Sequence, residues 1–366
     1  MFKNSPANNS HKNEILYNAK RKNQFITVPF PPLHVIIILS YNLNKGVIDM
    51  NTETRNEKIN AIRENIGKVL VGKEKLTDLI LTAIIAEGHI LLEDVPGSGK
   101  TVMAKSLARS IDAEFSRIQF TPDLLPSDVT GLNYYNQKEG EFTFREGPVF
   151  CNILLADEIN RATPRTQSAL LECMEERQVT VDGVTYPLDR PFFVIATQNP
   201  VETSGTFPLP EAQLDRFLMQ LSMGLPSVQE ECAIMERFLT SSPLTELGSV
   251  CTAEELIELQ KDYLDIRIHP MLIDYIARIV HATRTSGDCL AGVSPRGTLA
   301  LLRAVRAYAM VQGRSYVVPE DIKTLAIPVL AHRLVFPSGH ILDRTAERFL
   351  EGILDQTELP TEEWGK

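Results

Sequence analysis

The chain has 366 residues, of which 43% are hydrophobic and 23% are charged. This composition excludes a wholly disordered or collagen-like chain, and the length suggests about two domains. The formal net charge is −10 and the isoelectric point is about 5.3. A general nucleic-acid binder usually presents a basic face, so we expect nucleic acid to be an unlikely partner.

Residues 1–49 differ from the rest of the chain. They carry a net charge of +4 and eight Asn residues, whereas the remaining residues carry −14. Their one strong apolar run, residues 35–39, is far shorter than the roughly 20 residues of a membrane span. Basic residues 20–22 leave a signal peptide as an alternative, but no A-x-A-like cleavage site follows the run. We expect residues 1–49 to be a poorly ordered extension of a cytoplasmic protein that has no membrane span.

From Met50 onward, apolar spacing predicts regular elements. Before Pro226 the pattern alternates between helices (56–69, 76–84, 100–110, 164–176), buried strands (89–92, 115–120, 153–156, 192–196, 217–221) and two hairpins (133–145, 179–186). After Pro226 only helical patterns follow, over residues 228–239, 253–264, 270–285, 296–311, 319–334 and 346–354. We therefore expect an α/β fold with a central parallel sheet over residues 50–225 and an all-α domain over residues 226–366.

The first predicted strand runs into a glycine-rich turn that resembles the Walker A pattern G-x-x-x-x-G-K-[ST]. Glycines let backbone N–H groups turn toward phosphate oxygens, and the following helix points its positive end at them. Lys100 would reach the β- and γ-phosphates, and Thr101 would ligate magnesium. The pattern has Asp where its first Gly is usual. The expected nucleotide-binding residues here are Asp94, Val95, Pro96, Gly97, Ser98, Gly99, Lys100, Thr101 and Val102.

Two further strands end in polar residues that suit the same site. The apolar run 153–156 ends in Asp157 and Glu158, as a Walker B strand does, with Asp157 as the magnesium residue and Glu158 as the group that polarises the attacking water. The next buried strand ends at Asn199, at the sheet edge where open α/β folds bind ligands. Asn199 would orient that water, although an Asn-Pro turn is an equally good interpretation of this residue alone.

Two arginines are candidates for contact with the transferred phosphate. Arg216 lies just before the strand at 217–221, and Arg296 begins a helix of the all-α domain. An arginine that reaches the transferred group stabilises its charge. A surface salt bridge for Arg216 and a solvent-facing Arg296 stay open as alternatives.

Together these motifs, in this order, resemble those of an AAA+ ATPase, and the strings around them are similar to the MoxR family. The strings are residues 154–162, 167–171, 196–200 and 209–217, and the resemblance covers residues 54–354. It implies a P-loop AAA+ core with a helical lid, adenine contact by Val71 and Gly72, Asn199 as sensor 1, Arg216 as an arginine finger and Arg296 as sensor 2. The hairpins match an insert in helix 2 and a hairpin before sensor 1.

The resemblance also implies partners and an activity. An arginine finger acts on the neighbouring subunit's nucleotide, so the resemblance implies a homo-oligomeric ring, which we expect to be a hexamer. Whether Arg296 acts within its own subunit stays open, and Arg161 is a second candidate for contact across the interface. MoxR-like proteins use ATP and Mg²⁺ to remodel or assemble a client protein, and a frequent partner carries a von Willebrand factor A domain.

Two other functions are weighed against this one. A scaffold that binds ATP with little turnover would not need Glu158, which is intact. A nucleic-acid-directed AAA+ motor or a restriction GTPase relative is disfavoured because the chain is acidic and no Asn-Lys-x-Asp string follows the P-loop. The sequence thus favours an ATPase that acts on a protein partner.

Overall fold

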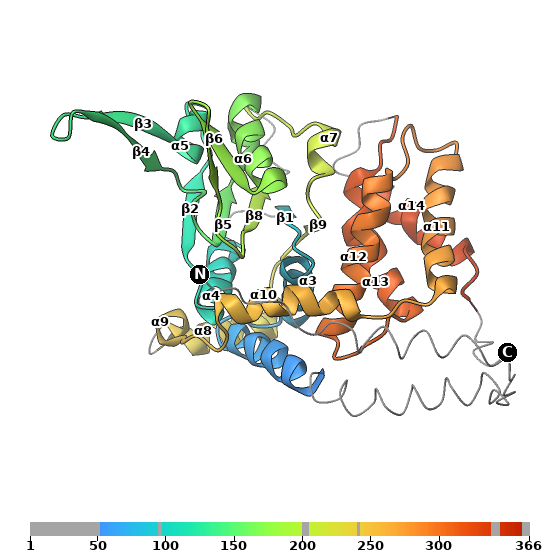
Figure 1. Cartoon of the computed structure of the whole chain (residues 1–366). Coiled ribbons are helices and arrows are strands. Elements are labelled where there is room, and N and C mark those ends of the chain that lie inside the picture. Colours follow the sequence, from blue (N-terminus) through green and yellow to red (C-terminus); the bar gives the residue numbers. More distant parts are fainter. Residues whose placement is uncertain (1–51, 94–96, 200–204, 240–241, 338–344, 361–366) are drawn as a thin grey trace, which may run out of the picture. The chain divides into compact units, whose positions relative to one another are not determined.

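The computed structural model describes residues 52–93, 97–199, 205–239, 242–337 and 345–360, which belong to one unit, Thr52–Lys366 (Figure 1). The extension expected at residues 1–49 lies outside the described residues. The described chain opens with a helix over residues 52–67, where sequence spacing predicted 56–69.

Five parallel strands form the central sheet, in the order β2-β5-β8-β1-β9. Each connection returns the chain to the same side of the sheet, so that the next strand runs in the same direction as the one before. The carboxyl ends of all five strands therefore lie along one edge of the sheet. The predicted strands are confirmed, with ends shifted by up to two residues. Their bounds are β1 Ile90–Glu93, β2 Phe115–Gln119, β5 Ile153–Asp157, β8 Phe193–Gln198 and β9 Met219–Leu221.

Alternation along the central strands divides the core between two faces of the sheet. In β5, Leu155 belongs to a cluster with α3 (Glu74–Ile85) and α4 (Lys100–Ser110), whereas Leu154 belongs to a cluster with α6 (Pro164–Glu176). Both side chains are fully buried. A strand covered on both faces needs apolar residues at every position, which explains the continuous apolar run before Asp157.

Two antiparallel hairpins interrupt the alternation of strands and helices. The first pairs β3 (Gly131–Asn136) with β4 (Glu141–Glu146) after the short α5 (Pro126–Thr130), and it extends away from the sheet (Figure 1). The second pairs β6 (Gln178–Val181) with β7 (Val184–Pro187). Both predicted hairpins are confirmed, and Gly183 takes a positive φ of 82° in the tight turn of the second.

Beyond β9 the regular elements of the described residues are helices joined by loops, apart from isolated bridges. Ser227, Thr252 and Ser294 each begin a helix with a side-chain oxygen that accepts a backbone N–H bond, which explains where these helices start. None of the described helices combines the length and apolarity that a membrane crossing requires. The helices are α8 Val228–Phe238, α9 Pro243–Glu246, α10 Ala253–Asp262, α11 Pro270–Thr285, α12 Pro295–Val311, α13 Pro319–Leu330 and α14 Thr345–Gln356.

His89 ties three elements together at the amino-terminal edge of the sheet. It directly precedes β1; its Nε2 lies 3.0 Å from the carbonyl oxygen of Met174 at the end of α6, and its Nδ1 accepts the N–H of Val194 in β8 at 3.0 Å. The ring is therefore neutral, with its proton on Nε2. Burial is the main cause that lowers the pKa of His89, to about 4.

This neutral, buried ring predicts a pH-dependent stability. The pKa is about 6.5 in an unfolded chain, so the unfolded state gains a proton first as pH falls, and the free energy of unfolding decreases between pH 6.5 and 4. We expect His89 to account for a loss of about 2 kcal/mol over this window. Urea unfolding at several pH values should show a shallower slope for His89→Gln than for the wild type. The exposed His281→Gln is the control, and equal slopes for His89→Gln and the wild type would contradict this assignment.

Candidate functional site

The glycine-rich turn leaves the carboxyl end of β1 and leads into α4. Gly97 and Gly99 have φ values of 84° and 94°, in the left-handed region that glycine adopts without strain. Gly99 caps α4, which begins at Lys100, so the N-terminus of this helix directly adjoins the turn. Residues 94–96 of the predicted motif lie outside the described residues. This backbone is the conformation that phosphate binding at a helix N-terminus requires.

The described part of the turn fits a polyphosphate and its metal ion. The Oγ of Ser98 is buried and has no hydrogen-bond partner in the described structure, although a buried hydroxyl normally has one. Lys100, Thr101 and Val102 form the partly buried first turn of α4. An oxygen-rich ligand placed there would give the Ser98 hydroxyl a partner.

Asp157 ends strand β5 and Glu158 follows it, and Thr197 of the adjacent β8 connects the two residues. The Thr197 hydroxyl donates to Asp157 Oδ1 at 2.6 Å and accepts the backbone N–H of Glu158 at 2.9 Å. Thr197 is fully buried, so this hydroxyl is held rigidly between the two acidic residues. Thr197 lies within the string 196–200 that resembles the MoxR family, but the sequence alone suggests no role for it.

Glu158 has a strained backbone, and its carboxylate makes two polar contacts. Its φ and ψ are 57° and 48°, a left-handed conformation that is uncommon for a residue other than glycine or asparagine. Its Oε2 accepts a hydrogen bond from Gln119 Nε2 at 2.8 Å and pairs with Arg161 Nε at 2.7 Å, where Arg161 ends the short helix η1 (Ile159–Arg161). The Glu158 carboxylate is therefore held by a residue from β2 and one from η1.

Arg117 is a residue that the sequence analysis missed. Its Nη2 lies 2.6 Å from Asp157 Oδ2 and 3.2 Å from Gln119 Oε1. Arg117 and Gln119 are two residues apart on β2, so they share one face of the strand, and Gln119 pairs in register with Asp157. The order of strands in the sheet, which the sequence did not reveal, brings these side chains to the acidic pair.

Asn199 lies at the same edge of the sheet. It follows β8 directly and is 7% exposed. Gln198, the last residue of β8, hydrogen-bonds to Glu93, the last residue of β1. The structure therefore brings Asn199 to the same sheet edge as the glycine-rich turn and Asp157, as the sequence predicted.

A cavity of about 360 Å³ lies beside the glycine-rich turn. Gly72 lines it together with Met223, and the Cε of Met223 lies 3.6 Å from the position that a Cβ on Gly99 would take. Gly72 has a φ of 66°, and the carboxylate of Glu230 from α8 is so close that any Cβ at position 72 would clash with it. Gly72, which follows Val71, thus borders a cavity next to the glycine-rich turn.

Arg216 lies at the opposite edge of the sheet. β9 begins at Met219, which pairs with Ile90 at the start of β1, so Arg216 precedes the amino-terminal edge of both strands. The glycine-rich turn follows the other end of β1, and the four residues of β1 span about 10–13 Å. Arg216 Nη1 donates to the carbonyl oxygen of Leu171 at 2.8 Å. Its guanidinium is therefore held away from the glycine-rich turn of its own chain.

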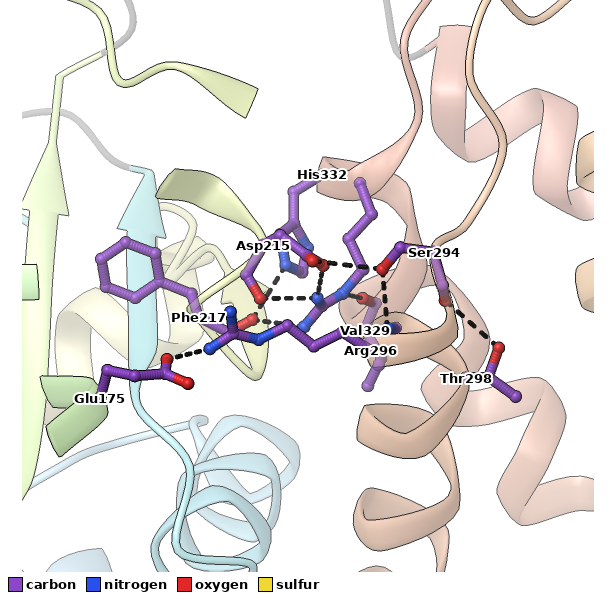
Figure 2. Close-up of polar contacts among 10 residues, drawn as sticks. Glu175, Asp215, Phe217, Ser294, Arg296, Thr298, Val329 and His332 are labelled. Carbon is purple, nitrogen blue, oxygen red and sulfur yellow. Dashed lines mark hydrogen bonds and ion pairs between the residues drawn. The ribbon is translucent and has the colours of Figure 1, made fainter. Parts of the chain in front are cut away.

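Arg296 lies beside Arg216 rather than beside the glycine-rich turn. It forms an ion pair with Glu175, near the end of α6 (Figure 2). Glu175 follows Met174, which contacts His89 at the amino-terminal edge of the sheet. The Arg296 side chain is 42% exposed, as the solvent-facing interpretation expected, but it is paired with Glu175 and lies away from the glycine-rich turn.

Arg216 also lines a cavity of about 500 Å³ that carries an acidic rim. The carboxylates on this rim belong to Glu172, Glu175 and Glu176 of α6, and Gln213 also lines the cavity. Because one of these carboxylates is paired with Arg296, two predicted arginines and a cluster of carboxylates share one surface.

A buried arginine fixes the segment that carries Arg216. Arg333 donates through Nη1 to the backbone oxygen of Asp215 at 2.8 Å and through Nη2 to the backbone oxygen of Phe217 at 2.6 Å, and it also pairs with the Asp215 carboxylate. Ser294 Oγ donates to Asp215 Oδ2 at 3.1 Å (Figure 2). Contacts from the helical part of the chain therefore hold the residues on both sides of Arg216.

Comparisons with known proteins agree with this geometry. Residues 89–219 match the ATPase family associated with various cellular activities (AAA), and residues 281–353 match the AAA lid domain. The chain is 51% identical over 300 residues to the uncharacterized protein YeaC of Bacillus subtilis, covering 82% of this chain and 94% of that protein. It is 41% identical over 305 residues to Chaperone MoxR1 of Mycobacterium tuberculosis, covering 81% of this chain and 80% of that protein.

Two further similarities are to a second curated protein and to a solved structure. Protein MoxR of Methylorubrum extorquens is 30% identical over 317 residues, covering 78% of this chain and 89% of that protein. A crystal structure of a candidate ATPase from Cytophaga hutchinsonii has a TM-score of 0.80 and 38% identity, covering 87% of this chain and all of that one. The α/β core and the helical part thus occur together in solved and curated proteins.

The left-handed backbone of Glu158 predicts that this residue lowers stability. A left-handed conformation costs roughly 1–2 kcal/mol for most residues, and Asn tolerates it better. We expect Glu158→Asn to raise the free energy of unfolding by about 0.5–1 kcal/mol relative to Glu158→Gln. Both variants remove the charge, so the difference between them in urea unfolding reports the backbone. A Glu158→Asn protein no more stable than Glu158→Gln would contradict the strain.

Proposed function

The chain belongs to the MoxR family of AAA+ ATPases, and we propose that it hydrolyses Mg²⁺-bound ATP and uses the turnover to remodel a protein partner. The observation that carries this proposal is the convergence of a phosphate-binding turn, Asp157, Glu158 and Asn199 on one edge of the sheet. Ligands of open parallel sheets bind at that edge.

We assign nucleotide binding to the turn and to the cavity beside it. The backbone of Gly97 to Gly99 and the side chain of Lys100 hold the phosphates, and Val71 and Gly72 border the adenine. Residues 94–96 and Val102 complete this assignment from the sequence motif. Thr101 and Asp157 hold the magnesium ion, and magnesium supplies charge neutralisation on the phosphate oxygens.

Glu158 is the general base in this proposal. A carboxylate at this position accepts a proton from the attacking water, and Asn199 orients that water. The hydrogen bonds from Gln119 and Arg161 to Glu158 Oε2 set the direction of the carboxylate. The rigid Thr197 bridge keeps Glu158 at a fixed place relative to Asp157.

The position of Arg216 supports a shared site between subunits. Because Arg216 and Arg296 lie at the sheet edge opposite the phosphate-binding turn, neither is placed to contact the nucleotide of its own chain. We propose that both act on the nucleotide of a neighbouring subunit in a ring, which we expect to be hexameric. Arg161, which pairs with Glu158 of its own chain, stays a second candidate for contact across the interface on the family resemblance alone.

The partner and the domain limits are proposals of the same kind. A chaperone name attaches to one curated relative, and we propose a client protein, with a von Willebrand factor A domain protein as a possible partner, in the cytoplasm. We propose that the ATPase consists of the core over residues 50–225 and the lid over 226–366, with residues 1–49 outside it. The β3–β4 hairpin, which exposes Tyr135 and Phe142, gives the core an apolar surface for a client.

The first functional prediction separates an ATPase from a nucleotide-binding scaffold. Glu158→Gln removes the base but keeps the shape of the side chain, so ATP binding should persist while the turnover rate falls by about 10²-fold or more. Binding is measured with a fluorescent ATP analogue and turnover by phosphate release. Glu351→Gln, an exposed carboxylate on α14, is the matched control. Turnover at the wild-type rate in Glu158→Gln would contradict the role of Glu158.

The second functional prediction concerns the shared site. Lys100→Ala subunits lack phosphate binding and Arg216→Ala subunits lack the arginine, so each variant alone should lose most of its ATPase activity. Mixing them should restore part of it, because roughly one site in four of a randomly mixed ring then has both residues intact. Arg278→Ala, at an exposed ion pair of α11, serves as the control. No recovery in rings shown by mass spectrometry to be mixed would count against a finger acting between subunits.

A further inference from the structure

We propose that Arg117 is a built-in competitor of magnesium for the carboxylate of Asp157. This inference rests on the proposed function, because it concerns the same acidic residue that we assign to the metal. Arg117 belongs to β2, a strand that contributes nothing to the Walker motifs. Its role would be to set how tightly the site holds a divalent cation.

Each carboxylate oxygen of Asp157 has one polar partner. Oδ1 accepts the hydroxyl of the buried Thr197 at 2.6 Å, whereas Oδ2 faces Arg117 Nη2 at 2.6 Å. The Asp157 side chain is 13% exposed. A divalent ion, or the water in its coordination shell, that approaches Asp157 through Oδ2 shares this oxygen with the guanidinium or displaces it.

The contact between Arg117 and Asp157 has the features of one that a cation can replace. Within the described part of the chain, its polar contacts run through the single nitrogen Nη2, to Asp157 and to Gln119 Oε1. Strong arginine–carboxylate pairs are frequently two-pronged, which adds energy and geometric specificity that this single-nitrogen contact lacks. The Arg117 side chain is 46% exposed, so solvent is available to it when it leaves Asp157.

The exchange replaces one positive charge with a doubly charged ion at the same carboxylate. Solvent partly screens the attraction of the carboxylate for the guanidinium and for the ion, because Arg117 is half exposed. An ion pair of this kind contributes little more than about 1 kcal/mol. Removal of the guanidinium should therefore tighten divalent-cation binding by about threefold to tenfold, which is the change that such an energy produces.

Divalent-cation binding by the full chain tests this proposal directly. With a non-hydrolysable ATP analogue at saturation, Mn²⁺ is titrated and the free ion is measured by electron paramagnetic resonance, so the readout does not depend on turnover. Arg117→Gln should lower the apparent Kd for Mn²⁺ by about threefold to tenfold. Arg117→Lys keeps the positive charge and should stay within about twofold of the wild type. Arg117→Met repeats the test without a polar group should the Gln variant fold poorly.

Two other variants separate competition from a general change in charge. Arg161→Gln removes a charge that pairs with Glu158 instead of Asp157, and it should shift the Kd less than Arg117→Gln does. Arg278→Gln, on α11, should leave it unchanged.

The outcomes distinguish this inference from the proposed function. An unchanged or weaker Mn²⁺ affinity in folded Arg117→Gln, or an equal shift in Arg161→Gln, would overturn the competition while wild-type binding upholds the metal site. A wild-type protein that binds no Mn²⁺ with the nucleotide analogue would overturn the proposed function and this inference together.

Discussion

The rest of this structure depends on one constraint, which is that all five strands of the sheet run in the same direction. Because every strand of the sheet runs the same way, the carboxyl ends of β1, β5 and β8 present the phosphate-binding turn, the acidic pair and Asn199 at a single edge. Because β9 also runs in this direction, Arg216, which precedes β9, lies at the opposite edge. One subunit therefore has the glycine-rich turn, Asp157, Glu158 and Asn199 on one side and Arg216 on the other.

Ion pairs and hydrogen bonds hold individual residues in place at both edges of the sheet. At the phosphate-binding edge, Arg117 and Arg161 accompany Asp157 and Glu158. At the opposite edge, Arg333 is buried against Asp215, and it holds the chain on both sides of Arg216 through backbone oxygens. A buried arginine that satisfies carbonyl groups fixes the backbone more firmly than an exposed pair does. The helical part of the chain thus positions a residue of the core.

The sequence predicted the fold well and the site in part. Apolar runs gave the strands and helices because β1, β5 and β8 are buried on both faces and the later helices have strong caps. The Walker motifs are local strings, so Gly97 to Thr101, Asp157 and Glu158 were found without the structure. Asn199 was placed correctly at the strand end, although its role stays a prediction.

Contacts between strands distant in sequence were the part that could not be predicted. Arg117 and Gln119 reach the acidic pair only because β2 pairs with β5, and a single sequence does not state this order. Likewise, the ion pair of Arg296 with Glu175 joins residues 121 positions apart. The sequence left two interpretations of Arg296 open, and the structure places it beside Arg216, away from its own phosphate-binding turn.

The central claim is that one subunit does not contain a complete site. The most direct measurement is the ATPase rate per subunit over a wide range of protein concentrations, with the assembled fraction determined in the same samples by sedimentation velocity. The account predicts that the rate per subunit rises in proportion to the assembled fraction and nearly vanishes for the monomer. A monomer that hydrolyses ATP at the rate of the assembled protein would contradict it.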